Sequence, residues 1–167
     1  MKLVSALFPL FLVFGLLSAA TPFPGEWKSE CRGAGDVPRQ TDGNAILNAS
    51  FPGGALLYKE RQRFLFAPDR AAFEAGSLSI DVKADGIRSP LKAWIFVKDK
   101  DGAWFQSGEE FSLKPGEWTR LSVRLDRSGQ DLFPQGHHAA WSGFFASRIF
   151  AAGVSLYSDS EQNGTIT

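Results

Sequence analysis

Alternation of apolar and polar residues is the clearest pattern in the second half of the chain. Apolar residues recur at every second position in 78–82 and again in 121–125. This period of two is typical of a half-buried β-strand. Apolar stretches at 45–51 and 154–157 predict two further strands, and no stretch shows the 3.6-residue period of a long amphipathic helix. Short strands separated by turn residues favour an antiparallel β-sandwich.

The strongest single prediction is a β-hairpin in 91–106. Asp101-Gly102 is a turn dipeptide with apolar residues on both sides. A turn with Gly102 left-handed gives the register Lys98–Trp104, Val97–Phe105 and Phe96–Gln106. Because side chains alternate between faces, one face is apolar and the other carries Trp94, Phe96, Lys98, Trp104 and Gln106. A solvent-facing strand does not need large aromatic residues beside polar ones, so the second face is the predicted binding surface.

Other segments give weaker patterns. We expect 22–40 to be irregular, 55–66 to contain one or two strands, and 130–145 to be a long loop. A short helical turn is expected at 148–152, and 164–167 looks like the start of another strand.

The first twenty residues have the features of a secretory signal peptide. A basic start at Met1-Lys2 precedes an apolar run from Leu3 to Leu17, and Ser18-Ala19-Ala20 supplies small residues for cleavage. A membrane anchor is the alternative, since the run could nearly span a bilayer, but no charged stop follows it. We therefore expect a secreted or periplasmic protein, with one domain over 21–167 and no membrane association after cleavage.

Composition limits the partners and the means of stabilisation. Without Lys2, 17 basic and 18 acidic residues remain, a net charge of −1. That balance gives no reason to expect nucleic acid or an anionic membrane as a partner. Cys31 is the only cysteine, so no internal disulfide can form. Burial must stabilise the fold, and 15 Phe and 5 Trp can supply it.

A resemblance to a known family rests on the segments 78–83, 95–107, 113–123, 136–143 and 152–158. Together they resemble the galactose-binding-domain-like jelly rolls. More narrowly, they are similar to carbohydrate-binding-type modules attached to secreted bacterial glycoside hydrolases. The resemblance covers 78–167 well and 27–73 loosely. It implies a jelly-roll β-sandwich that binds glycans, cell-surface groups or no known ligand.

The resemblance also bears on the last strand and on calcium. The family usually ends on a strand reading Thr-Leu-Asp-Asn-Ile/Val, whereas this chain stops at Gly164-Thr-Ile-Thr. We therefore expect a last strand that is cut short, and the chain could be the N-terminal module of a longer enzyme. The late Asp that helps to hold the family's structural calcium is absent. The residues present therefore do not support calcium, and no cofactor is predicted.

Two groups of residues are candidates for ligand contact. Trp94, Trp104 and Gln106 could form a platform, because sugar C–H faces stack on aromatic rings and polar neighbours bind hydroxyl groups. His137, His138 and Trp141 could contact the ligand from a long loop. The alternative for the platform is burial under a loop or against a neighbouring domain. Two adjacent histidines without a third ligand make a poor metal site, so no metal ligand is predicted.

Three other motifs have no predicted role. Asp99-Lys100-Asp101-Gly102 resembles the start of a calcium loop, but Trp104 stands where that loop needs Gly, and a hairpin turn explains the motif. The acidic residues are scattered, without a recognisable catalytic pair. Asn48-Ala-Ser and Asn163-Gly-Thr match the glycosylation sequon, a short pattern that arises often by chance.

We therefore predict a non-catalytic carbohydrate-binding module that positions an attached or partner hydrolase on a polysaccharide. Two alternatives stay open. In the first, the aromatic residues dock on a catalytic domain and bind no sugar. In the second, the chain is a small glycan-active enzyme, which requires two facing carboxyl groups in a cleft.

Overall fold

Two antiparallel β-sheets make up the described part of the chain. The computed structural model describes residues 28–29, 39–41, 44–52, 62–66, 76–126 and 131–167. The seven-stranded sheet comprises β1 (Lys28–Ser29), β4 (Gln62–Phe66), β6 (Leu91–Asp99), β7 (Trp104–Ser107), β8 (Phe111–Leu113), β10 (Leu132–Gln135) and β11 (Ile149–Tyr157). The five-stranded sheet comprises β2 (Arg39–Thr41), β3 (Asn44–Pro52), β5 (Ser77–Asp85), β9 (Trp118–Arg124) and β12 (Glu161–Ile166).

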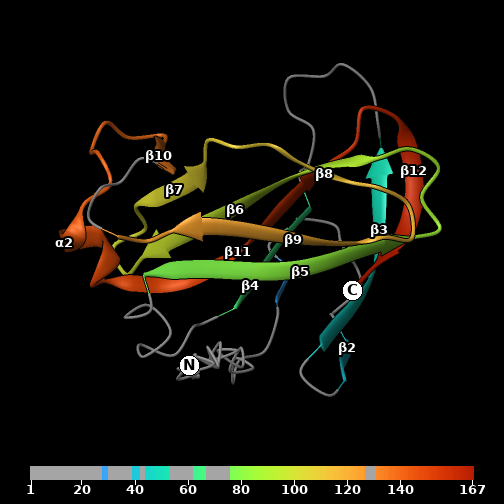
Figure 1. Ribbon diagram of the computed structural model, residues 1–167, viewed down its shortest axis with the longest axis horizontal. Helices are drawn as coiled ribbons and strands as arrows, with labels where there is room; N and C mark the ends of the chain where they lie inside the picture. Colours follow the sequence, from blue (N-terminus) through green and yellow to red (C-terminus); the bar gives the residue numbers. More distant parts are fainter. Residues whose placement is uncertain (1–27, 30–38, 42–43, 53–61, 67–75, 127–130) are drawn as a thin grey trace, which may run out of the picture.

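The strand order places the two sheets as layers of a β-sandwich of jelly-roll type. The larger sheet runs β1-β4-β11-β6-β7-β10, with β8 beside β6, and the smaller runs β2-β3-β12-β5-β9. Figure 1 shows β5 and β9 in one layer in front of β6, β11 and β4. One short helix, α2 (Gly143–Ala146), precedes β11.

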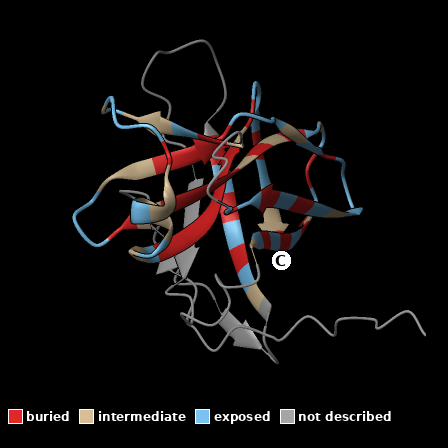
Figure 2. Ribbon diagram, turned by 60° about the vertical axis from the view of Figure 1, so that its left-hand side comes forward, coloured by how far each residue is buried: buried red, intermediate tan, exposed pale blue. Residues whose placement is uncertain are grey.

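The core lies between the two sheets. One side of each central strand is apolar and buried, as in β5, where Leu78, Ile80 and Val82 are buried and the residues between them are exposed or half-buried. β11 differs, because six successive residues from Ala151 to Leu156 are buried. Figure 2 shows both kinds of strand, some banded in red and pale blue and others red along most of their length. The seven-stranded sheet is therefore covered on both faces around β11.

The predicted hairpin is confirmed in register and turn. β6 and β7 pair through Phe96–Gln106, Val97–Phe105 and Lys98–Trp104. Gly102 has a φ of 87°, which a residue without Cβ adopts freely. The Asp99 carboxylate accepts hydrogen bonds from the backbone N–H groups of Asp101 and Ala103, so the motif serves the turn. The half-buried strands β5 and β9 are also where the alternation predicted them.

Three expectations about the last third of the chain were wrong. The segment expected to be a loop contains β10 and α2, and the expected helical turn at 148–152 is the start of β11. β10 carries Pro134, which is tolerated because this strand ends the order of its sheet. β12 begins at Glu161 and pairs with both β3 and β5. Its polar sequence conceals a strand whose buried residues are only Gln162 and Ile166.

The first twenty residues, expected to be a signal peptide, and the segments 30–38 and 53–61 lie outside the described residues. Within the described residues, no helix has the length and hydrophobicity needed to cross a membrane.

Candidate functional site

The predicted binding surface lies on the side of the seven-stranded sheet that points away from the core, and we call it the aromatic face. Strand alternation and pairing bring its residues together from four neighbouring strands: Trp94, Phe96 and Lys98 of β6, Trp104 and Gln106 of β7, Phe133 and Gln135 of β10, and Ser155 and Tyr157 of β11. The contributions of β10 and β11 were not predicted. Those of β10 were missed because that strand was taken for a loop.

Near the hairpin turn, the aromatic face carries a cation between two rings. The Lys98 ammonium lies 5.7 Å from the centre of the Phe96 ring and 5.6 Å from that of the Trp104 ring. The two rings meet edge to face at 5.8 Å. A cation over an aromatic face is attracted by the ring quadrupole, so this arrangement orients Trp104. Trp94, Lys98 and Trp104 are all partly exposed.

The centre of the aromatic face is covered. Phe96 and Ser155 are 0% exposed and Gln106 is 7% exposed. Among the described residues, the Oε1 of Gln106 and the Oγ of Ser155 are buried without a hydrogen-bond partner. Three parts of this face stay accessible. Phe133 of β10, opposite Gln106, is 51% exposed. The two ends of β6 are partly exposed, one with Trp104 and Lys98 and the other with Trp94 and Lys92, which is paired with Tyr157.

Lys92 supplies the positive charge at the second end. Its ammonium lies 3.1 Å from the Asp159 carboxylate and 5.8 Å from the centre of the Tyr157 ring. The hydrogen bond to Asp159 is the main cause that raises the pKa of Lys92 above its usual value. Lys92 therefore stays protonated at neutral pH and can donate hydrogen bonds.

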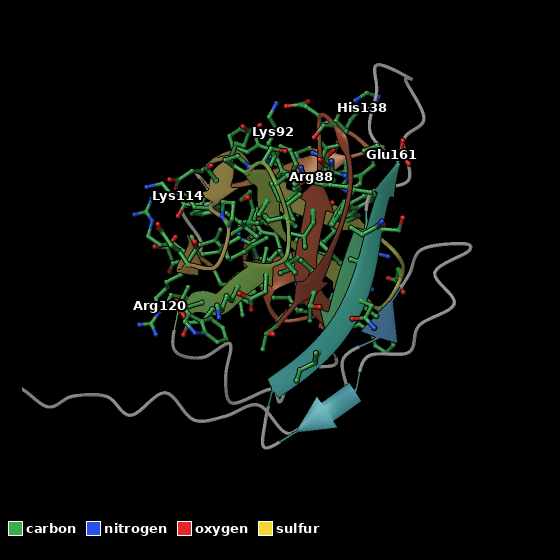
Figure 3. The ribbon with its side chains drawn as sticks, turned by 90° about the vertical axis from the view of Figure 1, so that its right-hand side faces the viewer. Arg88, Lys92, Lys114, Arg120, His138 and Glu161 are labelled. Carbon is green, nitrogen blue, oxygen red and sulfur yellow. The ribbon has the colours of Figure 1, made fainter. Side chains whose placement is uncertain are left out.

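His137 fastens the loop after β10 to the hairpin. Its Nε2 lies 3.0 Å from the carbonyl oxygen of Trp104, and its Nδ1 lies 3.3 Å from the backbone nitrogen of Ala139. Because the backbone N–H of Ala139 donates a hydrogen bond to Nδ1, the proton of the neutral ring lies on Nε2. This N–H donates a hydrogen bond to the carbonyl oxygen of Trp104. The ring also packs edge to face on Phe105 at 4.8 Å. His137 therefore holds the backbone of a platform residue, while His138 is exposed at the periphery (Figure 3).

Trp141 lies elsewhere than the sequence suggested. It is 6% exposed and packs on Phe105 at 5.0 Å, and its indole N–H donates to the carbonyl oxygen of Asp126 at 3.2 Å. Phe105 belongs to the core side of β7, so Trp141 lies on the opposite side of the sheet from Trp94 and Trp104. Its position makes it an anchor of the loop to the core.

The described residues hold no group of three His, Cys, Asp or Glu side chains placed to share a metal ion. Asp99, the first residue of the motif that resembles a calcium loop, is engaged otherwise. Its Oδ1 accepts the two turn N–H groups, and its Oδ2 lies 3.7 Å from Nε of Arg148. Arg148 also pairs with Asp101. This carboxylate is therefore part of the hairpin.

Comparison with known proteins gives likenesses in structure alone. The chain matches no protein-family model and no curated protein. The solved structure of PfGH50B superposes with a TM-score of 0.51 at 15% sequence identity, over 85% of this chain and 22% of that one. The family 11 carbohydrate-binding module of the cellulosomal cellulase Lic26A-Cel5E of Clostridium thermocellum gives a TM-score of 0.44 at 6% identity, over 86% of this chain and 79% of the module.

A family 11 module from the same organism, in complex with a β-1,3-1,4-mixed-linked tetrasaccharide, also gives a TM-score of 0.44, at 7% identity over 86% and 80% of the two chains. The present chain spans about 22% of the length of PfGH50B. At 15% sequence identity, the likeness to PfGH50B shows a shared β-sandwich fold and nothing further.

Proposed function

We propose that this protein is a non-catalytic carbohydrate-binding module and that the two ends of the aromatic face contact the glycan. The observation that carries the proposal is the pair of partly exposed residues Trp94 and Trp104 on one face of one sheet. Each is flanked by a lysine, Lys92 or Lys98. Indole rings can stack on sugar C–H faces, and ammonium groups can donate hydrogen bonds to hydroxyl groups.

The spacing of the two tryptophans favours an oligosaccharide as ligand. Trp104 is paired with Lys98, four residues along β6 from Trp94. At the rise of a β-strand, four residues span about 13 Å. This distance is greater than the length of one sugar ring, so the two indole rings would contact different sugar units of one glycan.

Attachment to a hydrolase is part of the proposal. In PfGH50B, by its name a glycoside hydrolase, the matching region is 22% of the chain. The two family 11 modules are by their names carbohydrate-binding, and one of them was solved with a bound tetrasaccharide. A module of this kind, exported by the predicted signal peptide, would position an attached or partner hydrolase on polysaccharide outside the cytoplasm.

Calorimetric titration of the protein with cellohexaose, laminarihexaose, xylohexaose and neoagarohexaose tests the proposal. Trp94→Ala and Trp104→Ala should each weaken binding of the recognised sugar about tenfold, because a lost aromatic contact costs on the order of 1–2 kcal/mol. Trp118→Ala is the matched control, since Trp118 is 56% exposed and lies on β9 of the other sheet. Equal losses in all three variants, or no loss in the first two, would refute the site.

One observation favours the docking alternative. Phe96, between the two tryptophans, is fully buried, as expected if the aromatic face serves mainly for packing. That alternative predicts that the folded protein binds none of the four sugars.

A further inference from the structure

A second polar surface lies on the outer side of the five-stranded sheet, away from the aromatic face. It is a hollow of about 650 Å³, and we call it the amide hollow. Its lining combines three elements: Asn48, Ala49 and Ser50 of β3, Asn163, Gly164 and Thr165 of β12, and Asp85 and Gly86 at the end of β5. No residue of this lining is aromatic.

The register of β3 and β12 gives this surface an ordered arrangement. The sequence Asn48-Ala49-Ser50 runs antiparallel to Asn163-Gly164-Thr165, with Asn163 opposite Ser50 and Thr165 opposite Asn48. Each triplet is an amide, a small residue and a hydroxyl, so two amides and two hydroxyls alternate at the corners of a rectangle of roughly 5 by 7 Å. The small residue in the middle of each triplet belongs to the other side of the sheet.

The close approach of a turn builds the wall of the amide hollow. A Cβ on Gly164 would lie 2.5 Å from Cγ2 of Ile87 and 2.8 Å from the carbonyl oxygen of Asp85. Glycine at 164 therefore allows the turn to pack against β12 from the core side. The pairing of Asp85 with Thr165 then places Asp85 beside the four polar side chains. Glycine inside a strand commonly marks such a close approach.

The polar groups of the amide hollow are partly preorganised. The Thr165 hydroxyl donates to Oδ1 of Asn48 at 3.3 Å, which directs the Asn48 amide nitrogen elsewhere. The Asp85 carboxylate lies 3.1 Å from the Lys83 ammonium, so its charge is locally compensated. Asn48, Ser50 and Asn163 are exposed. The surface thus offers amide donors, amide and carboxylate acceptors, and hydroxyl groups that can do both.

We propose that the amide hollow binds a neutral, polyhydroxylated ligand, such as a sugar unit of a glycan. Alternating donors and acceptors match vicinal hydroxyl groups, each of which donates one hydrogen bond and accepts others. A single compensated carboxylate is a poor site for a divalent cation and disfavours an anion. The proposal is independent of the aromatic face, because the two surfaces belong to different sheets. If both hold, the module contacts glycan on two sides.

Backbone amide NMR spectra of the ¹⁵N-labelled protein, titrated with the same four hexasaccharides, test this proposal. At least one sugar should shift the amide signals of 48–50, 85–86 and 163–165 together. Asn163→Ala and Asn48→Ala should each weaken this binding three- to tenfold, the effect of losing one hydrogen bond. Ser79→Ala is the matched control, since Ser79 is exposed on the same face and its hydroxyl bonds Ser122.

The outcomes separate this site from the aromatic face. In Trp104→Ala, the shifts at 48–50 and 163–165 should persist with unchanged affinity. Loss of those shifts in Trp104→Ala would overturn a separate site. If no sugar shifts the signals of 48–50 and 163–165, the proposed site is also overturned. It is likewise overturned if Asn48→Ala and Asn163→Ala both bind the sugar with the affinity of the wild type. If only the proposal for the aromatic face is wrong, Trp94→Ala and Trp104→Ala bind sugar like the wild type, and the sugar still shifts the signals of the amide hollow.

Discussion

At the scale of single residues, Gln162 shows how a buried polar side chain stabilises this fold. It is 1% exposed, and its amide group makes four hydrogen bonds. Its Oε1 accepts from the backbone nitrogens of Arg88 and Ser89 at 2.9 and 3.1 Å, and its Nε2 donates to the carbonyl oxygen of Ser89 and to Oγ of Ser158 at 3.2 and 2.6 Å. Gln162 thereby ties the turn after β5 to β12, and that turn forms the wall of the amide hollow.

Gln162→Ala should lower the free energy of unfolding by about 1–3 kcal/mol, because two partly buried backbone N–H groups lose their acceptor. Urea denaturation followed by tryptophan fluorescence measures the change. Glu161→Gln is the control, since Glu161 is the exposed neighbour on the same strand. An unfolding midpoint for Gln162→Ala equal to that of the control would show that the network contributes nothing.

Sequence patterns predicted residue positions well wherever a local rule applied. The left-handed Gly102 and the alternation in β5 are both local properties of the chain. The burial of Gln162 and Trp141 was not predicted, because a polar or amphipathic side chain is buried only when a distant segment supplies its partner.

At the scale of elements, the loop between β10 and α2 is held to the hairpin by His137 and Trp141. Trp141 packs on Phe105, which also contacts Phe145 of α2 at 4.7 Å. This aromatic cluster joins the loop, the short helix and β7. It explains why α2 forms with only four residues, since tertiary packing stabilises it in place of its own length.

Trp141→Ala should cost about 3–5 kcal/mol of stability, the range for removing a large aromatic side chain from a core. Its affinity for the recognised sugar should stay at the wild-type value below the unfolding temperature, because Trp141 lies on the core side of the sheet. Thermal denaturation and calorimetric titration of the same sample measure both quantities. A stable Trp141→Ala protein that no longer binds would return Trp141 to the ligand site.

At this scale, the hairpin was predicted in full and β10 was missed. The Asp-Gly turn and its flanking apolar residues carry a strong local signal. β10 has four residues and contains Pro134, so it is stable as a strand only through its pairing with β7. Phe133 and Gln135 therefore enter the aromatic face through an interaction that the local pattern does not reveal.

At the scale of the whole molecule, ion pairs across its outer surface make stability depend on pH. Arg120 of β9 makes two hydrogen bonds of 2.8 Å to Asp81 of β5, and Arg124 bonds Asp131 through its side chain and its backbone nitrogen. Hydrogen bonds from these arginines lower the pKa of both carboxyl groups. Figure 3 shows Arg120 pointing outward at the periphery of the fold.

The stabilisation from these two pairs should be lost in acid. A carboxyl group with a lower pKa in the folded state contributes fully above its unfolded pKa, about 3.9, and loses that contribution as the pH falls through the folded value. The double variant Asp81→Asn/Asp131→Asn should therefore show a flatter decline in unfolding free energy below pH 5. At neutral pH the variant should be less stable than the wild type by the amount that the wild type loses from these pairs in acid, and this amount is small because exposed pairs are screened.

Urea denaturation from pH 7 to pH 2 measures that slope. Glu117→Gln is the control, because Glu117 lies 4.0 Å from Lys114 and is 64% exposed. If the unfolding free energy of the double variant falls as steeply with decreasing pH as those of the wild type and the control, the two ion pairs do not contribute to the acid transition.

The sequence by itself determined the β-sandwich class, the hairpin register and the residues of β6 and β7 on the aromatic face. These follow from period-two alternation and turn chemistry, which act between neighbours along the chain. Only the tertiary structure decided which outer positions are covered and which strands lie side by side. It covered Phe96, placed Trp141 in the core, and set Asn48 against Thr165, 117 residues away. Such contacts depend on strand order, and the free energy that selects this order is the burial of the whole core.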